Sequence, residues 1–523
     1  MGSKQGENTP RSMDRRSFFK LGGLTAGAAA LTGGMLAGCA PQNPTEMAQT
    51  GGENETVAAS VPYAVYDTDI LLIGGGFGAS FAMQEACKAG KNMLVIDKAP
   101  YGFGGAFGMS FDIMQTWVPG AYYETEEEVP VATKIRNDSL YRKTGVQNEV
   151  ELNPDVVVAN WGEILSARNE DGTPFYIYDF PTTRGFEHSM TRHWSDYFRS
   201  KDYVTVHDRT MITDLIIEDG RCLGAVGLHL PTGEYRVYRA KVTLSATGGC
   251  TQFYGWNSTS ATTNNVLDNT ADVEMALLRH GGKIANAEFG SYDMMGAFPR
   301  SFTASEGSMV GADSVHSGDL MDFEGTYLKD YPEIAEKEYL TTQSGVMQAV
   351  DVVVRAGKGS ENGGVYLDCK QESLSTMRWM YQRNAQLLKE KFGYDFTAQP
   401  TEVVPEMYEH GGEPITDDNA MCVDAEGLFC VRANAGSEGG MMNITNRRMG
   451  RYAMKRALEY LAAYEEPASV TYEGVAAEIA RLEDLRTRTV DDPLRPITVR
   501  RNIQYACAEA ARPVRPTDVL ETA

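Results

Sequence analysis

The sequence predicts an α/β fold built on a Rossmann-like dinucleotide-binding domain. An apolar strand at residues 69–73 leads into a glycine turn and a helix, and a second apolar strand at 93–96 ends in Asp97. This order of strand, turn, helix, strand and acid is the pattern of a dinucleotide site. A third apolar strand, at 241–249, ends in small residues, so that backbone can approach a cofactor at a second place.

The glycine turn has the residue types that close contact with a pyrophosphate requires. Gly74 lets the strand turn tightly, Gly76 lets backbone approach the phosphates, and Ala79 keeps the helix close to the strand. The helix offers its N-terminal N–H groups and positive dipole end to the phosphates. Asp97 lies 23 residues after Gly74, where a carboxylate takes the adenosine ribose hydroxyls. The alternative is a glycine-rich turn in an α/β protein without a nucleotide.

Further apolar segments predict a β-meander and one more strand. The meander comprises strands at 210–220, 222–230 and 234–239, with turns at Asp219-Gly220 and Thr232-Gly233. Residues 427–436 predict another strand that ends in small residues, and a second glycine cluster occupies 102–108. These segments extend the α/β pattern well beyond the first glycine turn.

The first 38 residues predict an export signal rather than part of the fold. Residues 14–20 have the form of a twin-arginine signal, and the Gly/Ala-rich stretch after them is too weakly apolar for a convincing membrane span. Leu36-Ala-Gly-Cys39 resembles a bacterial lipoprotein box and predicts lipidation of Cys39. The alternative is a plain cleaved signal in which this cysteine is discarded. Residues 39–66 are predicted to form a flexible tether.

These features predict a protein on the periplasmic or extracytoplasmic face of the cell membrane, anchored there by lipid. Twin-arginine substrates are typically folded before transport, often with a cofactor loaded, which agrees with a dinucleotide protein. The net charge is −23, and removing residues 1–38 removes five basic and two acidic residues, which moves it to about −26. Such a charge excludes nucleic acid as a partner and leaves membrane attachment to the lipid.

The cysteines predict neither an attached haem nor an ordinary iron–sulfur site, because no CxxC or CxxCH motif is present. We expect scattered core thiols and no metal, although a cluster assembled from distant cysteines is the alternative. The eight residues are Cys39, Cys87, Cys222, Cys250, Cys369, Cys422, Cys430 and Cys507.

In this order, the segments resemble the flavoprotein family of fumarate reductase, succinate dehydrogenase and adenylylsulfate reductase, over about residues 67–465. The resemblance rests on Gly74–Ala79, Asp97-Lys98, Ala246-Thr-Gly-Gly249, Val365-Tyr-Leu-Asp368, Tyr408 followed by Gly411-Gly412, and Gly427-Leu-Phe429. It implies a fold with an FAD-binding domain in two parts, an inserted α+β capping domain and a helical C-terminal tail. The implied bounds are 67–299 and 401–465 for the FAD-binding domain, 300–400 for the cap and 466–523 for the tail.

The resemblance also implies the cofactor and its contacts. Family members with covalent flavin carry a His in the glycine cluster, and residues 99–120 contain none, so FAD is expected to be noncovalent. The residues expected to contact FAD are Gly74, Gly76, Phe77, Gly78, Ala79, Asp97, Lys98, Gly104, Gly105, Ala106, Met211, Ala246, Thr247, Gly248, Asp272, Ala433, Asn434 and Asn443.

The family's reaction is hydride transfer between flavin N5 and a carbon–carbon bond next to a carbonyl. Its fumarate reductases hold both substrate carboxylates with His and Arg side chains. In this chain Asp293 and Met407 stand at the two His positions, and Val350 and Ile444 stand at the two Arg positions. The family's acid is kept as Glu306, in Ser305-Glu306-Gly307.

These replacements argue against fumarate or succinate as the substrate. A dianion would lose several charge-assisted hydrogen bonds, each worth roughly 1.5–3 kcal/mol, and would face two carboxylates. The resemblance therefore implies a larger, neutral or hydrophobic small-molecule substrate. The positions expected to line its pocket are Asp293, Ser305, Val350, Met407, His410 and Ile444.

A proton donor must then come from another side chain. Glu306 is the first candidate, because an apolar pocket raises a carboxyl pKa toward a useful range; a structural carboxylate that caps a turn is the alternative. Tyr408 is the second, with an aromatic core residue as its alternative. Weaker candidates, for which solvated or packing positions are the expected alternatives, are His188, His193, Arg355, His410 and Arg447-Arg448.

The sequence therefore predicts an exported FAD-dependent oxidoreductase that reduces an activated C=C bond. Enones, lactones, cinnamate-like acids and steroids are the substrate class. Electrons must come from a separate membrane or periplasmic carrier such as a multihaem cytochrome. Three alternatives stay open: oxidation in the reverse direction, as in 3-ketosteroid dehydrogenases; a flavin electron-transfer or assembly subunit without its own substrate; and a divergent relative of adenylylsulfate reductase with an iron–sulfur partner chain.

Overall fold

The computed structural model describes most of the segments on which these expectations rest. They are residues 61–105, 190–250, 269–296, 319–368, 389–431 and 442–510, apart from a few positions inside the last four ranges. Among these residues, no helix combines the length and the apolar character needed to cross a bilayer.

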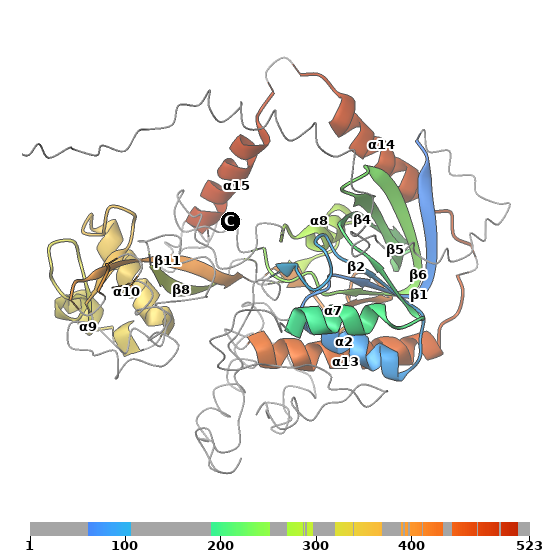
Figure 1. Cartoon of the computed structure of the whole chain (residues 1–523). Helices are drawn as coiled ribbons and strands as arrows, with labels where there is room; N and C mark the ends of the chain where they lie inside the picture. Colours follow the sequence, from blue (N-terminus) through green and yellow to red (C-terminus); the bar gives the residue numbers. More distant parts are fainter. Residues whose placement is uncertain are drawn as a thin grey trace, which may run out of the picture. The chain divides into compact units, whose positions relative to one another are not determined.

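The larger sheet has seven strands in the order β3-β2-β1-β6-β5-β4, with β13 paired to β6 (Figure 1). Strands β3, β2, β1, β6 and β13 run parallel, and β6, β5 and β4 form an antiparallel meander. The strands are β1 Tyr63–Ile73, β2 Met93–Ile96, β3 Val204–His207, β4 Thr210–Glu218, β5 Arg221–His229, β6 Glu234–Ser245 and β13 Leu428–Cys430.

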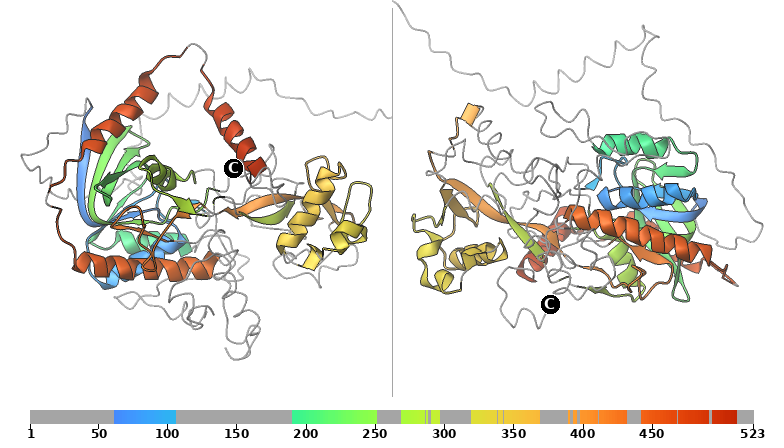
Figure 2. Two further views of the ribbon diagram at one scale, coloured as in Figure 1. Left: turned by 180° about the vertical axis from the view of Figure 1, so that it is seen from behind. Right: turned by 90° about the horizontal axis from the view of Figure 1, so that it is seen from below.

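The helices on one face of this sheet pack around α2, Phe77–Lys88. Helix α13, Met442–Ala462, lies side by side with α2, and α7, Met190–Arg199, joins the same apolar cluster (Figures 1 and 2). A Cβ atom at Gly450 would stand 2.2 Å from the carbonyl oxygen of Gly78, so only glycine lets the two helices approach this closely.

Three further helices follow the order expected for an α/β domain with a helical tail. Helix α8, Asp272–Arg279, packs on the opposite face of the sheet through Val273, Ala276 and Leu277. Helix α14, Glu473–Thr487, contributes Val475 and Ile479 to a cluster with the meander, and α15 spans Pro496–Ala510.

The second sheet is antiparallel, with four strands in the order β8-β11-β10-β9. Its helix α10 packs an apolar face into the buried cluster of this sheet. Two of its strands, β8 and β11, lie outside the residues 300–400 expected for the cap. The elements are β8 Gly290–Gly296, β9 Asp319–Met321, β10 Val365–Asp368, β11 Thr401–His410, the helices α9 Pro332–Ala335 and α10 Gln343–Arg355, the 3-10 turns η5 Leu328–Asp330 and η6 Tyr339–Thr341, and the separate pair β7 Ile284–Ala285 with β12 Glu413–Pro414.

The predicted meander is confirmed, but its last strand differs from the expectation. Residues 234–239 and 241–249 were expected to form two strands, whereas β6 is one strand of twelve residues. Its first half pairs with β5 and its second half with β13, while β1 runs along its other edge. Strand β1 begins at Tyr63, inside the expected tether; β13 spans Leu428–Cys430, and residues 432–436 of the expected 427–436 strand lie outside the described residues.

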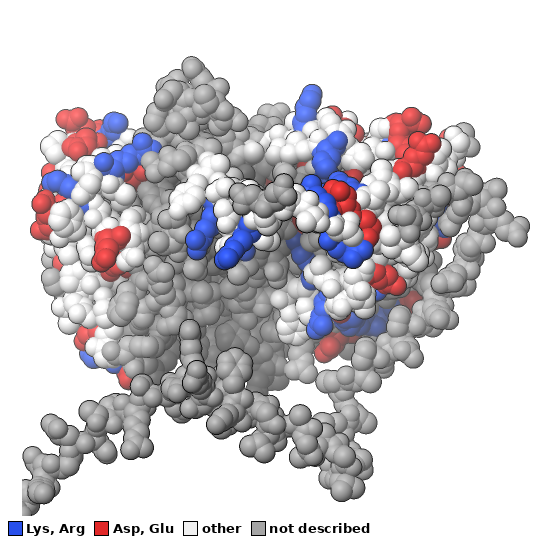
Figure 3. Space-filling model, turned by 90° about the horizontal axis from the view of Figure 1, so that it is seen from above, with Lys and Arg blue, Asp and Glu red and all other residues white. Residues whose placement is uncertain are grey.

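Acidic and basic side chains alternate over the described part of the face in Figure 3. Two ion pairs join β1 to β6: Arg239 pairs with Asp67 at 2.6 Å, and Lys241 with Asp69 at 3.0 Å. Each such exposed pair contributes about 0–1 kcal/mol to stability.

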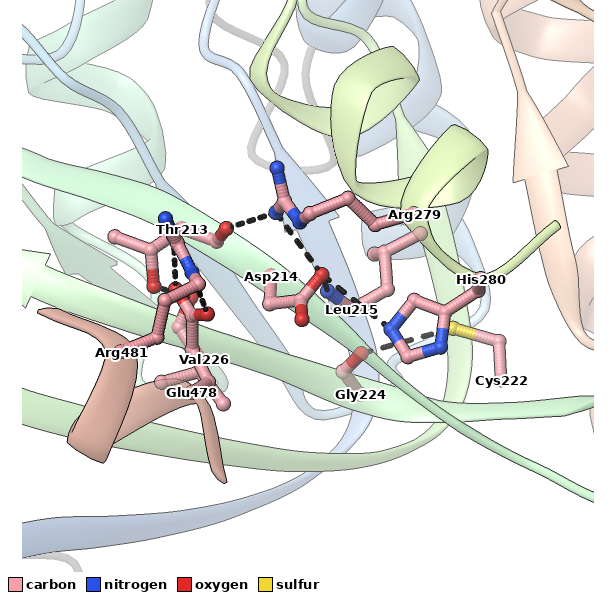
Figure 4. A network of polar contacts seen from close by, with 10 residues as sticks. All are labelled: Thr213, Asp214, Leu215, Cys222, Gly224, Val226, Arg279, His280, Glu478 and Arg481. Atoms are coloured by element: carbon pink, nitrogen blue, oxygen red, sulfur yellow. Dashed lines mark hydrogen bonds and ion pairs between the residues drawn. The ribbon is translucent and has the colours of Figure 1, made fainter. Parts of the chain in front are cut away.

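A polar network fixes the C-terminal end of α8 to the meander (Figure 4). The carboxylate of Asp214 accepts hydrogen bonds from Arg279 Nη2 at 3.1 Å and from the Leu215 N–H at 3.0 Å, and it lies 3.3 Å from His280 Nε2. In the same view, Glu478 of α14 pairs with Arg481 at 2.6 and 2.8 Å. Burial raises the pKa of Asp214, but the bonds from its neighbours outweigh burial and lower it overall.

Replacing His280 with glutamine is expected to lower stability at acid pH only. The hydrogen bond to Asp214 raises the pKa of His280 above 6.5, so its contribution is complete below the unfolded pKa and is lost as pH rises through the folded value. Because the pair is half-exposed, we expect a deficit of about 0.5–1 kcal/mol at pH 5.5 and none at pH 8.5, measured by urea unfolding. His229→Gln is the control, since the pKa of His229 is lowered; an equal acid-side deficit there would contradict the assignment.

Candidate cofactor-binding site

The turn after β1 needs glycine at its first position. Gly74 has φ +98, its N–H donates to Ile96 O at 2.8 Å, and a Cβ there would lie 2.4 Å from Ala246 O. The ends of β1 and β6 are tied together, because the Ala246 N–H donates to Ile73 O at 2.8 Å. The turn is therefore backed directly by the chain that leaves β6.

The start of α2 is open and carries no opposing charge. Gly76 caps the helix, the first turn contains no acidic residue, and a Cβ at Gly76 would have no neighbouring atom within 4 Å. Ser80 donates to Gly76 O through both its N–H and its hydroxyl, which holds the first turn in place. Phe77, Gly78 and Ala79 form that turn, whose N–H groups and dipole suit an anion.

Asp97 lies against the turn through both carboxylate oxygens. Oδ2 accepts the Gly75 N–H at 2.8 Å, and Oδ1 accepts the Ala99 N–H at 2.8 Å. Burial raises the pKa of Asp97 to about 6, although the two N–H bonds oppose the shift. Each oxygen keeps a second lone pair, so the carboxylate can still accept a ribose hydroxyl.

Gly104 and Gly105 belong to the second glycine cluster, and Gly104 lies against Asp97. A Cβ at Gly104 would meet Asp97 Oδ1 at 2.8 Å, and Gly105 has φ +67 with open space around it. Met211 follows Thr210, whose N–H donates to Asp97 O at 2.9 Å, so β4 begins beside the acid. The structure thus gathers these positions around the end of β2.

The start of α8 meets the same region through polar contacts. Lys98 Nζ lies 2.5 Å from Asp272 Oδ2 and 2.5 Å from Thr270 Oγ1, and Thr270 donates to Asp272 at 2.8 Å. Gly248 has φ +68, and Asn269 Nδ2 donates to Gly249 O at 3.2 Å. The segment after β6 is therefore fixed between the glycine turn and α8.

Two residues of this region were missed by sequence reasoning. Tyr101 is wholly buried, with its hydroxyl 3.2 Å from Ser80 Oγ and 3.2 Å from Met83 Sδ. Glu274 is buried on α8 and accepts the Thr247 hydroxyl at 3.3 Å. The signal for Glu274 was its position beside the apolar stripe of α8, which placed an acid toward the core.

Several expected site residues lie outside the described residues or have only their backbone described. Outside are Ala106, His188, Ser305, Glu306, Ala433 and Asn434; backbone alone is described for His193, Asp293, Met407, Tyr408, His410, Asn443, Ile444, Arg447 and Arg448. Asp293 on β8 and Met407 on β11 lie on paired strands, in adjacent residue pairs. Tyr408 occupies the irregularity in that pairing, a type of position found next to many active sites.

Val350 and Arg355 are the described candidates on α10. Val350 is wholly buried in an apolar cluster that includes Val346 and Val353. Arg355 Nε lies 3.1 Å from both oxygens of Asp351, which is 1% exposed. Arg355 thus compensates a buried carboxylate of its own helix.

The geometry fits a dinucleotide at the glycine turn. An open helix start without an acid suits a pyrophosphate, and an acid at the end of β2 suits a ribose. A side chain at Gly76 would fill the space that this turn leaves open. The residues that would hold the group are those of the turn, Asp97, Lys98 and the segment 246–248.

Residues 168–507 match the family model described as "FAD binding domain". A fumarate reductase (CoM/CoB) chain of Methanothermobacter marburgensis is 25% identical over 489 residues, which cover 88% of this chain and 84% of that protein. A digoxin reductase of Eggerthella lenta is 37% identical over 127 residues, 23% of this chain and 21% of that protein. The structure of the E. coli quinol fumarate reductase FrdA superposes with a TM-score of 0.62 at 18% identity and covers 88% and 81% of the two chains.

Proposed function

Because the chain belongs to the FAD binding domain family, we propose that it is an exported enzyme that reduces an activated C=C bond of a neutral or hydrophobic substrate. Its cofactor is FAD, and it is an FAD-dependent oxidoreductase of the fumarate reductase and succinate dehydrogenase family. Bound FAD supplies hydride chemistry at the double bond, and a side chain of the protein supplies the proton.

The observation that carries this proposal is the apolar burial of Val350. Where the resemblance expects a cation for a substrate carboxylate, α10 has a valine inside its core cluster. The nearby guanidinium of Arg355 is already paired with Asp351. A dianion would find no cation at this position, a partner worth roughly 1.5–3 kcal/mol, which favours a substrate without two carboxylates.

The relatives support a broad substrate range for such a site. The digoxin reductase takes its name from digoxin, while the Methanothermobacter marburgensis relative is named as a fumarate reductase. The loss of the carboxylate-binding residues favours enones, lactones or steroids. Reduction is the proposed direction.

Electrons are proposed to come from a separate carrier such as a multihaem cytochrome. The sequence contains no CxxCH motif, so the chain offers no haem attachment of its own. The twin-arginine pattern and Cys39 support a site of action outside the cytoplasm, with lipid as the membrane anchor. Both the carrier and the location are part of the proposal.

An anaerobic reoxidation assay tests the proposed substrate class. Dithionite-reduced protein is mixed with fumarate, an enone, an unsaturated γ-lactone and a 3-keto-4-ene steroid, and the return of flavin absorbance is followed. We expect a neutral acceptor to reoxidise the flavin at least about 100-fold faster than fumarate, as the lost ion pairs imply. Fastest reoxidation by fumarate would refute the substrate class, and no reoxidation by any acceptor would favour a subunit without its own substrate.

A further inference from the structure

Glu274 is a buried carboxyl group that the proposed reaction does not use. Its side chain lies in the first turn of α8 and is 6% exposed. Oε1 accepts the Thr247 hydroxyl at 3.3 Å, and among the described residues Oε2 has no hydrogen-bond partner. Burying such an oxygen as an anion is costly, so the site favours the neutral acid.

One hydrogen bond connects this carboxyl group to the back of the glycine turn. Thr247 Cα lies 3.2 Å from where a Cβ of Gly74 would stand, and the carbonyl oxygen of Ala246 lies 2.4 Å from it. The segment that Glu274 holds is thus in van der Waals contact with the turn. A change in the charge of Glu274 can therefore affect the glycine turn through its hydrogen bond to Thr247 and through the contact of residues 246 and 247 with Gly74.

The charges around Glu274 are mostly negative. Glu413, itself buried, and Asp272 both act on it, and the thiol of Cys250 lies in the same environment. The neighbouring cation, Lys98, is bound to Asp272 at 2.5 Å. Burial raises the pKa of Glu274 to about 7; its own backbone N–H and the Thr247 hydroxyl oppose the shift, and the charge of Glu413 adds to it.

We propose that Glu274 is a proton-linked residue behind the glycine turn, whose neutral form is compatible with bound FAD and whose ionised form weakens cofactor binding. The pyrophosphate of FAD is a dianion, so a second buried negative charge behind the turn repels it. The inference rests on FAD occupying the glycine turn, as in the proposed function.

Thermodynamic linkage predicts how the dissociation constant of FAD depends on pH. If FAD binds the neutral form of Glu274, its dissociation constant rises about tenfold per pH unit above the pKa of the free protein. Burial also raises the pKa of Asp97, to about 6, so the Glu274→Gln variant is what assigns the loss of FAD affinity at alkaline pH.

The experiment measures FAD release from the holoprotein on dilution, by recovery of free-flavin fluorescence between about pH 6 and 9. For the wild-type protein, we expect the dissociation constant of FAD to rise about tenfold per pH unit above about pH 7.5. For Glu274→Gln, we expect it not to change with pH in this range. Thr247→Ser, which keeps the hydroxyl, should keep the slope. Glu413→Gln removes a charge that raises the pKa of Glu274, so the onset should move to lower pH.

The result that overturns the inference is an unchanged alkaline slope in Glu274→Gln. A flat wild-type profile also overturns it. Neither outcome touches the proposed substrate class, because no substrate is present in the assay. Purified protein that carries no flavin at pH 6 would instead refute the cofactor assignment on which both proposals rest. A circular dichroism melt at pH 6 confirms that each variant is folded.

Discussion

Replacing Gly74 with alanine is expected to abolish FAD binding and to cost about 3 kcal/mol of stability. The residue has φ +98, a conformation that L side chains rarely adopt, and the added Cβ would stand 2.4 Å from a backbone carbonyl oxygen. The strand ends would have to separate, since Ala246 is bonded to β1 at this point. Urea unfolding and the flavin content of the purified protein measure both effects.

Gly76→Ala, at the same turn, is expected to weaken FAD binding without lowering the stability of the fold. The position is extended backbone with φ −77, and no atom lies within 4 Å of the added Cβ. Stability should therefore stay within about 0.5 kcal/mol of wild type, while FAD affinity falls about 10- to 100-fold because the methyl group enters the phosphate space. Gly474→Ala, also in open space but in α14, is the control and should leave FAD unchanged. Full FAD affinity in Gly76→Ala would exclude the turn as the phosphate site.

Replacing Glu306 with glutamine is expected to lower turnover about 10²- to 10⁴-fold, the usual contribution of a general acid. Glutamine keeps the size of the side chain but cannot supply a proton. The measurement is the rate of reoxidation of reduced protein by its best acceptor, with flavin content as the check on folding. Flavin reduction by dithionite should be unaffected, because that step needs no substrate proton.

Tyr408→Phe is the matched comparison for this prediction. Tyr408 lies at the irregularity between β8 and β11, and its hydroxyl is the other candidate donor. If Glu306 is the donor, Tyr408→Phe should lower turnover by less than about tenfold. The reverse order of effects would transfer the assignment to the tyrosine, and two unchanged rates would remove both residues from the proton path.

The parallel core of the fold was readable from local patterns, but the length of β6 and the pairing of β13 were not. Charged residues at 239 and 241 interrupt the apolar pattern and favour a turn between two strands. In the structure they pair with Asp67 and Asp69 of β1, so β6 continues through them. The described residues of β13 pair with Thr243, Leu244 and Ser245 of β6. Both facts depend on partners that lie far away along the chain.

In the candidate site, too, local features were predictable from the sequence and long-range contacts were not. The glycines and Asp97 were predictable because a turn and a strand end impose local requirements. The neighbours of Glu274 were not predictable, because Thr247 and Glu413 lie far from it along the chain, Glu413 139 residues further on. Substrate residues could be compared with the family one by one, but only Val350 among them has a described side chain.

The close approach of α2 and α13 has a consequence for how this protein is made. Gly78 and Gly450 are separated by more than two thirds of the chain, yet their backbones meet at the centre of the core. A ribosome that has synthesised β1, α2 and β2 has therefore produced an apolar helix face whose partner α13 does not yet exist. The part of that face that α13 covers is buried only once residue 450 emerges, so the cofactor domain completes its core near the end of translation, which exposes nascent chains to aggregation.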